Sequence, residues 1–151
     1  MIQKIEDNIL LLHPPVNQWI MAFNTHDVGA IVALYTEDAE LFDSGMKHPR
    51  HGREEIQQWF STRFSSIPSI NYVPTGQVFM EDGQAALTWT TRGKVPLLLG
   101  QAWLARRFQV DGVSVFLFRD GLIQKQRGYY DHLSAIEQIL PPVKWILPRR
   151  L

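Results

Sequence analysis

The sequence predicts an α+β fold in which a cone-shaped, strongly bent antiparallel sheet is covered by about three helices. Hydrophobic residues recur mostly at helical spacing before Pro68, and mostly at strand spacing after it. The pairs Asp82-Gly83 and Asp120-Gly121 are typical of tight turns between antiparallel strands. The 151 residues, 45% of them hydrophobic, suit one domain over residues 1–151 with its core at about 16–140.

Three helices are expected in the first half of the chain. The first has one apolar side, formed by Val16, Trp19, Ile20 and Phe23. A second, short helix begins after Asp27, a residue type that caps helix N-termini. The third begins at Gly52 and carries Glu54 and Glu55 in its first turn, where the helix dipole favours negative charge. Its buried side is expected to contain Ile56, Trp59, Phe60, Phe64 and Ile67.

The strands are predicted from alternation and turn signals. A short strand over residues 39–43 lies between the second and third helices, and four longer ones follow, over 70–80, 85–94, 103–119 and 122–130. The pair Asp111-Gly112 lies too close to the last hairpin to bound two full strands, so we expect a β-bulge there. A final helix over 134–140 ends before Pro141-Pro142.

Asp43 is the most informative residue of the first strand. Alternation places Ala39, Leu41 and Asp43 on the face that points toward the core. A carboxylate on a core face is costly unless it is paired, protonated or exposed to a wet pocket. Asp43 therefore either caps the following loop, by accepting backbone N–H groups of Gly45 or Met46, or lines a cavity.

Composition excludes several classes of function. Fifteen basic and fifteen acidic residues give a formal charge of zero, and no basic stripe appears, so nucleic acid is not an expected partner. The longest N-terminal apolar run, residues 9–12, is too short for a signal peptide or a membrane span, so we expect no membrane partner and a cytoplasmic location. The absence of cysteine excludes disulfides, thiolate catalysis and cysteine-based zinc sites.

The histidines offer two readings. His48 and His51 form an H-x-x-H pattern in a loop, but such a pattern without a regular scaffold is usually solvated, so no metal site is expected. His51 is instead a candidate proton relay, because the pKa of imidazole suits that role. No organic cofactor is expected either, since enolisation of an activated ketone can proceed without one.

Ordered motifs carry a family resemblance from about residue 16 to 140. They read F-N-T-H-D-V-G-A-I-V-A-L-Y-T-E-D-A-E-L-F-D, H-G-R-E-E-I, G-V-S-V-F-L-F-R-D-G-L-I and Y-Y-D-H-L-S-A-I-E-Q-I-L. Together they resemble the nuclear transport factor 2-like superfamily, and within it the SnoaL-like polyketide cyclases. The resemblance implies a small-molecule enzyme that uses carboxylate acid/base chemistry on a hydrophobic, polyketide- or steroid-like ring, of cyclase or isomerase type. A non-catalytic ligand-binding or protein-interaction module of the same fold stays open as the alternative.

The resemblance also implies roles for single residues. Asp43 stands where ketosteroid isomerases keep their general base, and Asp131 where SnoaL-like cyclases keep their acid/base, although Asp131 also suits a helix cap. Trp19 and Ser114 stand where those isomerases have their oxyanion donors, and can each donate one hydrogen bond. The expected catalytic residues are thus Asp131, Asp43 and His51, and the expected substrate-binding residues are Trp19, Ser114, Phe116, Tyr130 and Trp59.

The expected partners are a small hydrophobic ligand and a second copy of the chain. The strands carry apolar residues on both faces, as Val113 and Val115 alternate with Phe116 and Phe118. An apolar outer face needs a cover. We therefore expect a homodimer formed largely through the sheet.

Overall fold

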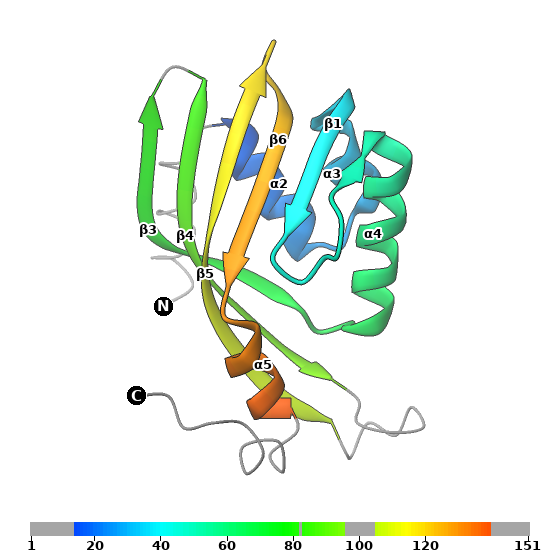
Figure 1. The fold of residues 1–151 in the computed structure, drawn as a ribbon, viewed down its shortest axis with the longest axis vertical. Helices are drawn as coiled ribbons and strands as arrows, with labels where there is room; N and C mark the ends of the chain where they lie inside the picture. The colour runs from blue at the N-terminus through cyan, green and yellow to red at the C-terminus, as the bar shows by residue number, and fades with distance from the viewer. Residues whose placement is uncertain (1–13, 82, 96–104, 140–151) are drawn as a thin grey trace.

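The computed structural model describes residues 14–81, 83–95 and 105–139 (Figure 1). In chain order, the elements of this part are α2 (Pro14–Asn24), α3 (Val28–Ala33), β1 (Tyr35–Asp43), β2 (Arg50–His51), α4 (Gly52–Ser66), β3 (Asn71–Glu81), β4 (Gln84–Val95), β5 (Arg106–Arg119), β6 (Leu122–Tyr130) and α5 (His132–Ile139). No helix of the described ranges is long and apolar enough to cross a membrane.

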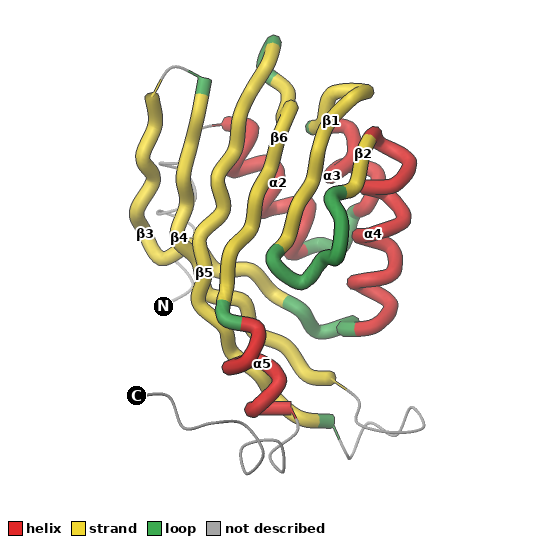
Figure 2. The backbone as a smooth tube through the Cα atoms, in the orientation of Figure 1, coloured by secondary structure: helices red, strands yellow, loops and turns green. Residues whose placement is uncertain are grey.

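The six strands form one curled sheet in the order β2-β1-β6-β5-β4-β3. The tube in Figure 2 shows the sheet wrapping around α2, with the lower ends of β4 and β5 sweeping past the other strands. The predicted α+β class with a bent sheet is confirmed. One detail differs, because β1 pairs with β6 in parallel, whereas antiparallel pairing was expected throughout. The long connection from β1 through α4 and the other strands allows this pairing, since parallel neighbours need a crossover of a dozen or more residues.

Alternation along β5 decides which side chains face the helices. Phe108, Val110, Ser114 and Phe116 are buried on the concave face, while Val115 points outward. On that concave side, Trp19 of α2 lies at the centre of an aromatic cluster with Phe23, Phe60, Tyr72 and Phe116. The concave face of the sheet and the apolar side of α2 therefore share one core.

The bulge predicted at Asp111-Gly112 is wrong. β4 and β5 pair without interruption from Gln84 opposite Leu117 to Val95 opposite Arg106. Gly112 is required for another reason: a Cβ atom there would lie 2.5 Å from ring atoms of Trp89 and 2.6 Å from the carbonyl oxygen of Tyr129. The register shift of β5 lies instead between Leu117 and Phe118, in its pairing with β6.

The hairpin predicted at Asp120-Gly121 is confirmed. Asp120 has φ 54° and Gly121 has φ 78°, which is the backbone of a tight two-residue turn between antiparallel strands. In the other predicted hairpin, Gly83 also has a positive φ of 77°, and Asp82 lies outside the described residues.

Candidate active site

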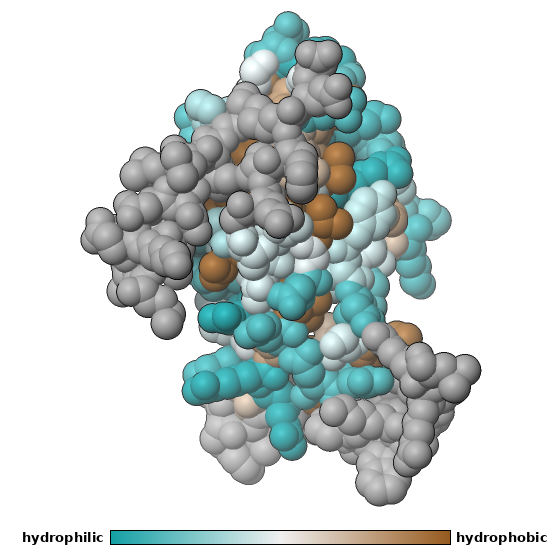
Figure 3. Space-filling view, turned by 90° about the vertical axis from the view of Figure 1, so that its left-hand side faces the viewer, coloured by the Kyte–Doolittle hydropathy of each residue, from teal (hydrophilic) through white to brown (hydrophobic). Residues whose placement is uncertain are grey.

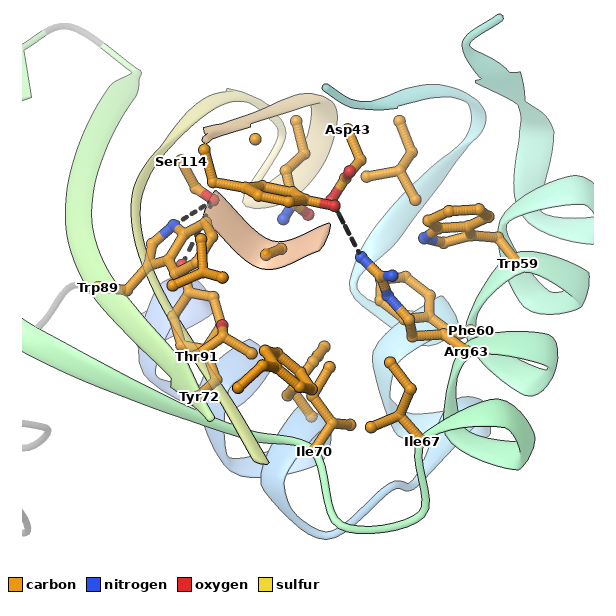
Figure 4. Close-up of a pocket in the computed structure, with 18 of the residues that line it drawn as sticks. Asp43, Trp59, Phe60, Arg63, Ile67, Ile70, Tyr72, Trp89, Thr91 and Ser114 are labelled. Atoms are coloured by element: carbon orange, nitrogen blue, oxygen red, sulfur yellow. Dashed lines mark hydrogen bonds and ion pairs between the residues drawn. The ribbon is translucent and has the colours of Figure 1, made fainter. Parts of the chain in front are cut away.

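A cavity of about 150 Å³ opens between the concave face of the sheet and helices α2, α4 and α5 (Figure 4). Most of its wall is apolar and includes Phe23, Leu41, Phe60, Ile67, Ile70, Phe108, Val110 and Ile139. A cavity of about this volume, lined by apolar side chains, can bind a benzene-sized molecule. The space suits a small hydrophobic ring.

Asp43 lines this cavity at the end of β1, where its side chain is 19% exposed. Its Oδ1 atom accepts the backbone N–H of Gly45 at 2.9 Å, and its Oδ2 atom lies 3.5 Å from Nη2 of Arg63. Asp43 therefore both caps the following loop and lines the cavity, which were the two alternatives that the sequence left open. One oxygen caps the loop, and the other pairs with a cation at the cavity.

Arg63 of α4 connects Asp43 with two aromatic residues of the cavity wall. Its guanidinium lies 5.1 Å from the ring centroid of Trp59, which keeps it over the ring face. Its Nη2 donates to the hydroxyl of Tyr130 over 3.4 Å. Burial raises the pKa of Tyr130, and the charge of Asp43 raises it further, so this phenol keeps its proton. In Figure 4, Asp43 and Arg63 approach each other across the cavity.

Ser114 lies on the opposite wall with two donors around it. Its Oγ atom accepts Nε1–H of Trp89 at 3.0 Å and the hydroxyl of Tyr72 at 3.3 Å (Figure 4). Burial raises the pKa of Tyr72 well above its usual range. Sequence reasoning did not select Tyr72 or Trp89. Their inward position on alternating strands, with a polar group on an aromatic ring, was a signal that could have found them.

Trp19 lines the cavity with its ring, but its N–H is already used. Nε1 donates to the hydroxyl of Tyr35 at 3.0 Å, and Tyr35 in turn donates to Oε1 of Gln126. Gln126 also lines the cavity and was not selected from the sequence. The sequence feature that could have indicated it is that Gln126 is a polar residue at an inward-facing position of β6.

The structure brings together only part of the predicted site. Trp19, Asp43, Trp59, Ser114 and Tyr130 line the same cavity, and three predicted residues do not. Phe116 is fully buried and packs against Trp19. His51 is exposed at the start of α4, where its backbone N–H donates to Glu55.

Asp131 is the third predicted residue outside the cavity lining. It lies just before α5, and its Oδ1 accepts the backbone N–H of Ser134 at 3.2 Å, the contact expected of a helix cap. Asp43 is thus the one acidic side chain among the described residues that line the cavity. No group of three or more histidine, aspartate or glutamate side chains in the described part of the chain is arranged to hold a metal ion.

The fold is similar to that of a solved protein described as having a ketosteroid isomerase-like fold. The sequence matches the SnoaL-like domain over residues 16–126, and the chain belongs to that family. No curated protein matches it.

Solved structures show the same fold at low sequence identity. One is a protein from Catenulispora acidiphila with a ketosteroid isomerase-like fold, solved with trimethylamine (20% identity, TM-score 0.75, covering 89% of this chain and 98% of that one). Another is a candidate SnoaL-like polyketide cyclase from Jannaschia sp. CCS1 (17%, 0.72, 89% and 93%). A third is IdmH from Streptomyces antibioticus, a candidate polyketide cyclase (19%, 0.70, 84% and 99%).

Proposed function

We propose that this SnoaL-like protein is a cofactor-independent enzyme of cyclase or isomerase type, with Asp43 as its acid/base and a small hydrophobic ring compound as its substrate. The observation that supports this most directly is a carboxylate on the wall of a mostly apolar, aromatic-lined cavity. Catalytic carboxylates are typically found in such clefts.

The proposed chemistry starts with removal of a proton from a carbon next to a carbonyl group. The carboxylate of Asp43 takes the proton, and the electron pair of the C–H bond moves into an enolate whose charge lies on oxygen. In an isomerase, Asp43 returns the proton to a different carbon. In a cyclase, the enolate carbon attacks a second carbonyl group, and the new alkoxide takes the proton. Protonated hydroxyl groups in the cavity, such as that of Tyr130, stabilise the negative oxygen in either case.

Asp131 as an acid/base and His51 as a proton relay have less structural support than Asp43. Asp131 keeps its match to the cyclase acid/base, but its carboxylate caps α5 and does not line the cavity. His51 is exposed and also lies outside the lining. Asp43 therefore stands as the principal group, and Asp131 is tested separately below.

Exchange of carbon-bound hydrogen tests the proposal without knowledge of the natural substrate. Cyclohex-3-enone is a small ring whose protons next to the carbonyl are acidic, and its conversion to cyclohex-2-enone needs one base. We expect the protein to accelerate deuterium uptake or double-bond migration above the buffer rate, followed by NMR. Asp43→Asn should lower the acceleration by roughly 10²- to 10⁴-fold, the usual contribution of a general base. An unchanged rate in Asp43→Asn would reject the proposed mechanism.

The second candidate is a ligand-binding module without chemistry. It is favoured by the contacts of Asp43, which already pairs with Arg63 and caps Gly45. A small amine is one ligand to consider, because a structural neighbour was solved with trimethylamine and aromatic walls attract cations. The positive charge of Arg63, which also lines the cavity, disfavours binding of a cationic amine there. Saturable binding of ring compounds, with no exchange above buffer, would favour the module.

Two further properties are proposed with this function. The protein is expected in the cytoplasm, which cell fractionation checks, and as a homodimer, which is argued in the Discussion.

A further inference from the structure

We propose that Gln126, together with the Ser114–Tyr72 hydroxyl pair, forms a two-donor site that recognises one carbonyl oxygen of the ligand. This inference rests on the proposed small-molecule function and narrows its substrate class to ring ketones or enones. It assigns Trp19 and Tyr35 the task of positioning Gln126.

Proton counting determines how the carboxamide of Gln126 is turned. Indole Nε1–H of Trp19 can only donate, so the oxygen of Tyr35 accepts this bond. The proton of Tyr35 must then find an acceptor, and the Oε1 atom of Gln126 provides it. If the amide were turned over, two donors would meet at this point and the buried Tyr35 proton would lack a partner. The –NH₂ group of Gln126 therefore points away from Tyr35.

The two N–H bonds of that –NH₂ group have no acceptor among the described residues. Gln126 is only 4% exposed, and its side chain lines the cavity. Its nitrogen is not one of the fully enclosed polar atoms that lack a partner, so it borders the open space of the cavity, where an acceptor can reach it. A ligand oxygen can be that acceptor.

The Ser114 group also has one hydroxyl proton to spare. Trp89 donates to Ser114, and a single bond joins the hydroxyls of Ser114 and Tyr72. Two hydroxyl protons are present, but that bond uses only one of them. Tyr72 donates in that bond, so the proton of Ser114 has no acceptor among the described residues, and both residues line the cavity.

The free donors and Asp43 face one small space. Positions 126 and 128 lie on the same face of β6, two residues apart. Gly128 is the partner of Ser114 in the pairing of β5 with β6. The position of a Cβ atom on Gly128 would lie 3.7 Å from Oδ2 of Asp43 and 3.8 Å from Oγ of Ser114. A carbonyl oxygen held by the donors would thus place its neighbouring carbon on the side of Asp43. Donors without a matching acceptor select a carbonyl compound over a hydrocarbon of the same shape.

The test compares two probes of equal shape, cyclohexanone and methylenecyclohexane, titrated into ¹⁵N-labelled protein. Wild type should bind the ketone roughly tenfold more tightly, as expected for two neutral hydrogen bonds. The side-chain NH₂ resonances of Gln126 should shift with the ketone and not with the alkene. Gln126→Leu should remove most of this preference. Gln124→Leu, the same change at a nearby β6 position that does not line the cavity, should retain it.

Two further variants separate recognition from folding. Ser114→Ala removes the second donor and should also lower the preference for the ketone. Tyr35→Phe leaves a side chain of the same shape but releases the amide, so it should reduce the preference and change the NH₂ resonances of Gln126 before any ligand is added.

Three results would overturn the inference. They are equal affinity of wild type for both probes, binding of neither probe, and an undiminished preference in Ser114→Ala or Gln126→Leu. The outcome does not depend on turnover. A protein that prefers the ketone but catalyses no exchange would contradict the proposed function and support this carbonyl site. A protein that catalyses exchange but has no preference for the ketone would support the proposed function and contradict this site.

Discussion

Each oxygen of Asp43 has its own task, and the sequence indicated only half of this arrangement. Strand alternation correctly placed the side chain on the inner face, because that position depends on neighbouring residues alone. The partner, Arg63, lies twenty residues away on α4, and only tertiary packing brings its Nη2 to 3.5 Å. Trp19 illustrates the same limit: its inward position was predictable, but Tyr35 as the acceptor of its N–H was not.

Gly112 offers a residue-scale test of packing. Gly112→Ala would place a methyl group 2.5 Å from the ring of Trp89, between that ring and the carbonyl of Tyr129. We expect a loss of about 1–3 kcal/mol in the free energy of unfolding, the usual cost of overpacking a core. Urea denaturation measures it.

Gly29→Ala is the matched control. The nearest atom to the new methyl group would be Oδ1 of Asp27 at 3.5 Å, which is an ordinary contact. Because alanine favours helices, this variant should gain about 0.5–1 kcal/mol. A Gly112→Ala protein as stable as wild type would show that Trp89 does not occupy the place described.

The buried phenols predict a response to alkaline pH. Burial raises the pKa of Tyr35, Tyr72 and Tyr130 in the folded protein above the ordinary value of 10.0. The folded state therefore holds these protons more tightly than the unfolded state. Their contribution to stability is complete below pH 10 and is lost as the pH rises beyond it. Phenolate absorbance should show these tyrosines ionising only as the protein unfolds, and Tyr72→Phe should weaken the alkaline loss of stability.

At the scale of elements, the start of α5 separates the two readings of Asp131. Asparagine caps helices about as well as aspartate, so Asp131→Asn should leave the free energy of unfolding nearly unchanged, whereas Asp131→Ala should lower it by about 0.5–2 kcal/mol. Thermal denaturation measures both. If Asp131→Asn also retains full exchange activity, the residue is a cap only. If the exchange is lost while stability is kept, its proposed acid/base role gains support.

The order of the elements was predictable, but the pairing of β1 was not. Period changes and turn residues indicated where helices and strands lie, because these signals are local. Inward alternation along residues 39–43 reads the same whether the neighbouring strand runs parallel or antiparallel, so the pairing of β1 with β6 left no trace in the pattern. The bulge predicted at Gly112 was wrong for a related reason. In the sequence, a glycine required because an aromatic ring approaches the backbone cannot be distinguished from a glycine required by a bulge.

At the scale of the whole molecule, the outer face of the sheet carries an apolar patch. In Figure 1 the upper part of this face, turned toward the viewer, has no described helix over it. Val113 lies opposite Tyr129 on neighbouring strands, and Val115 lies opposite Ala86. Val115 is 37% exposed and Tyr129 is 42% exposed. Ion pairs of Glu40 with Lys125 and Arg127 border the patch.

Figure 3 shows another side of the molecule, where hydrophilic residues gather on the lower half of the described surface. Polar cover of that kind needs no partner, whereas an apolar sheet face does. The patch formed by Ala86, Val113, Val115 and Tyr129 is therefore the surface through which we expect a second copy to bind.

Val115→Asp tests this homodimer. In a symmetric interface the substitution places two charges in the contact at once, because each copy contributes the same patch. We expect the variant to sediment as a monomer at low micromolar concentration, where the wild type sediments as a dimer. Met21→Asp is the control, since Met21 is an exposed apolar residue on α2, away from the sheet, and the change should leave the dimer intact. A monomeric wild type would contradict the prediction, as would a Val115→Asp protein that remains a folded dimer.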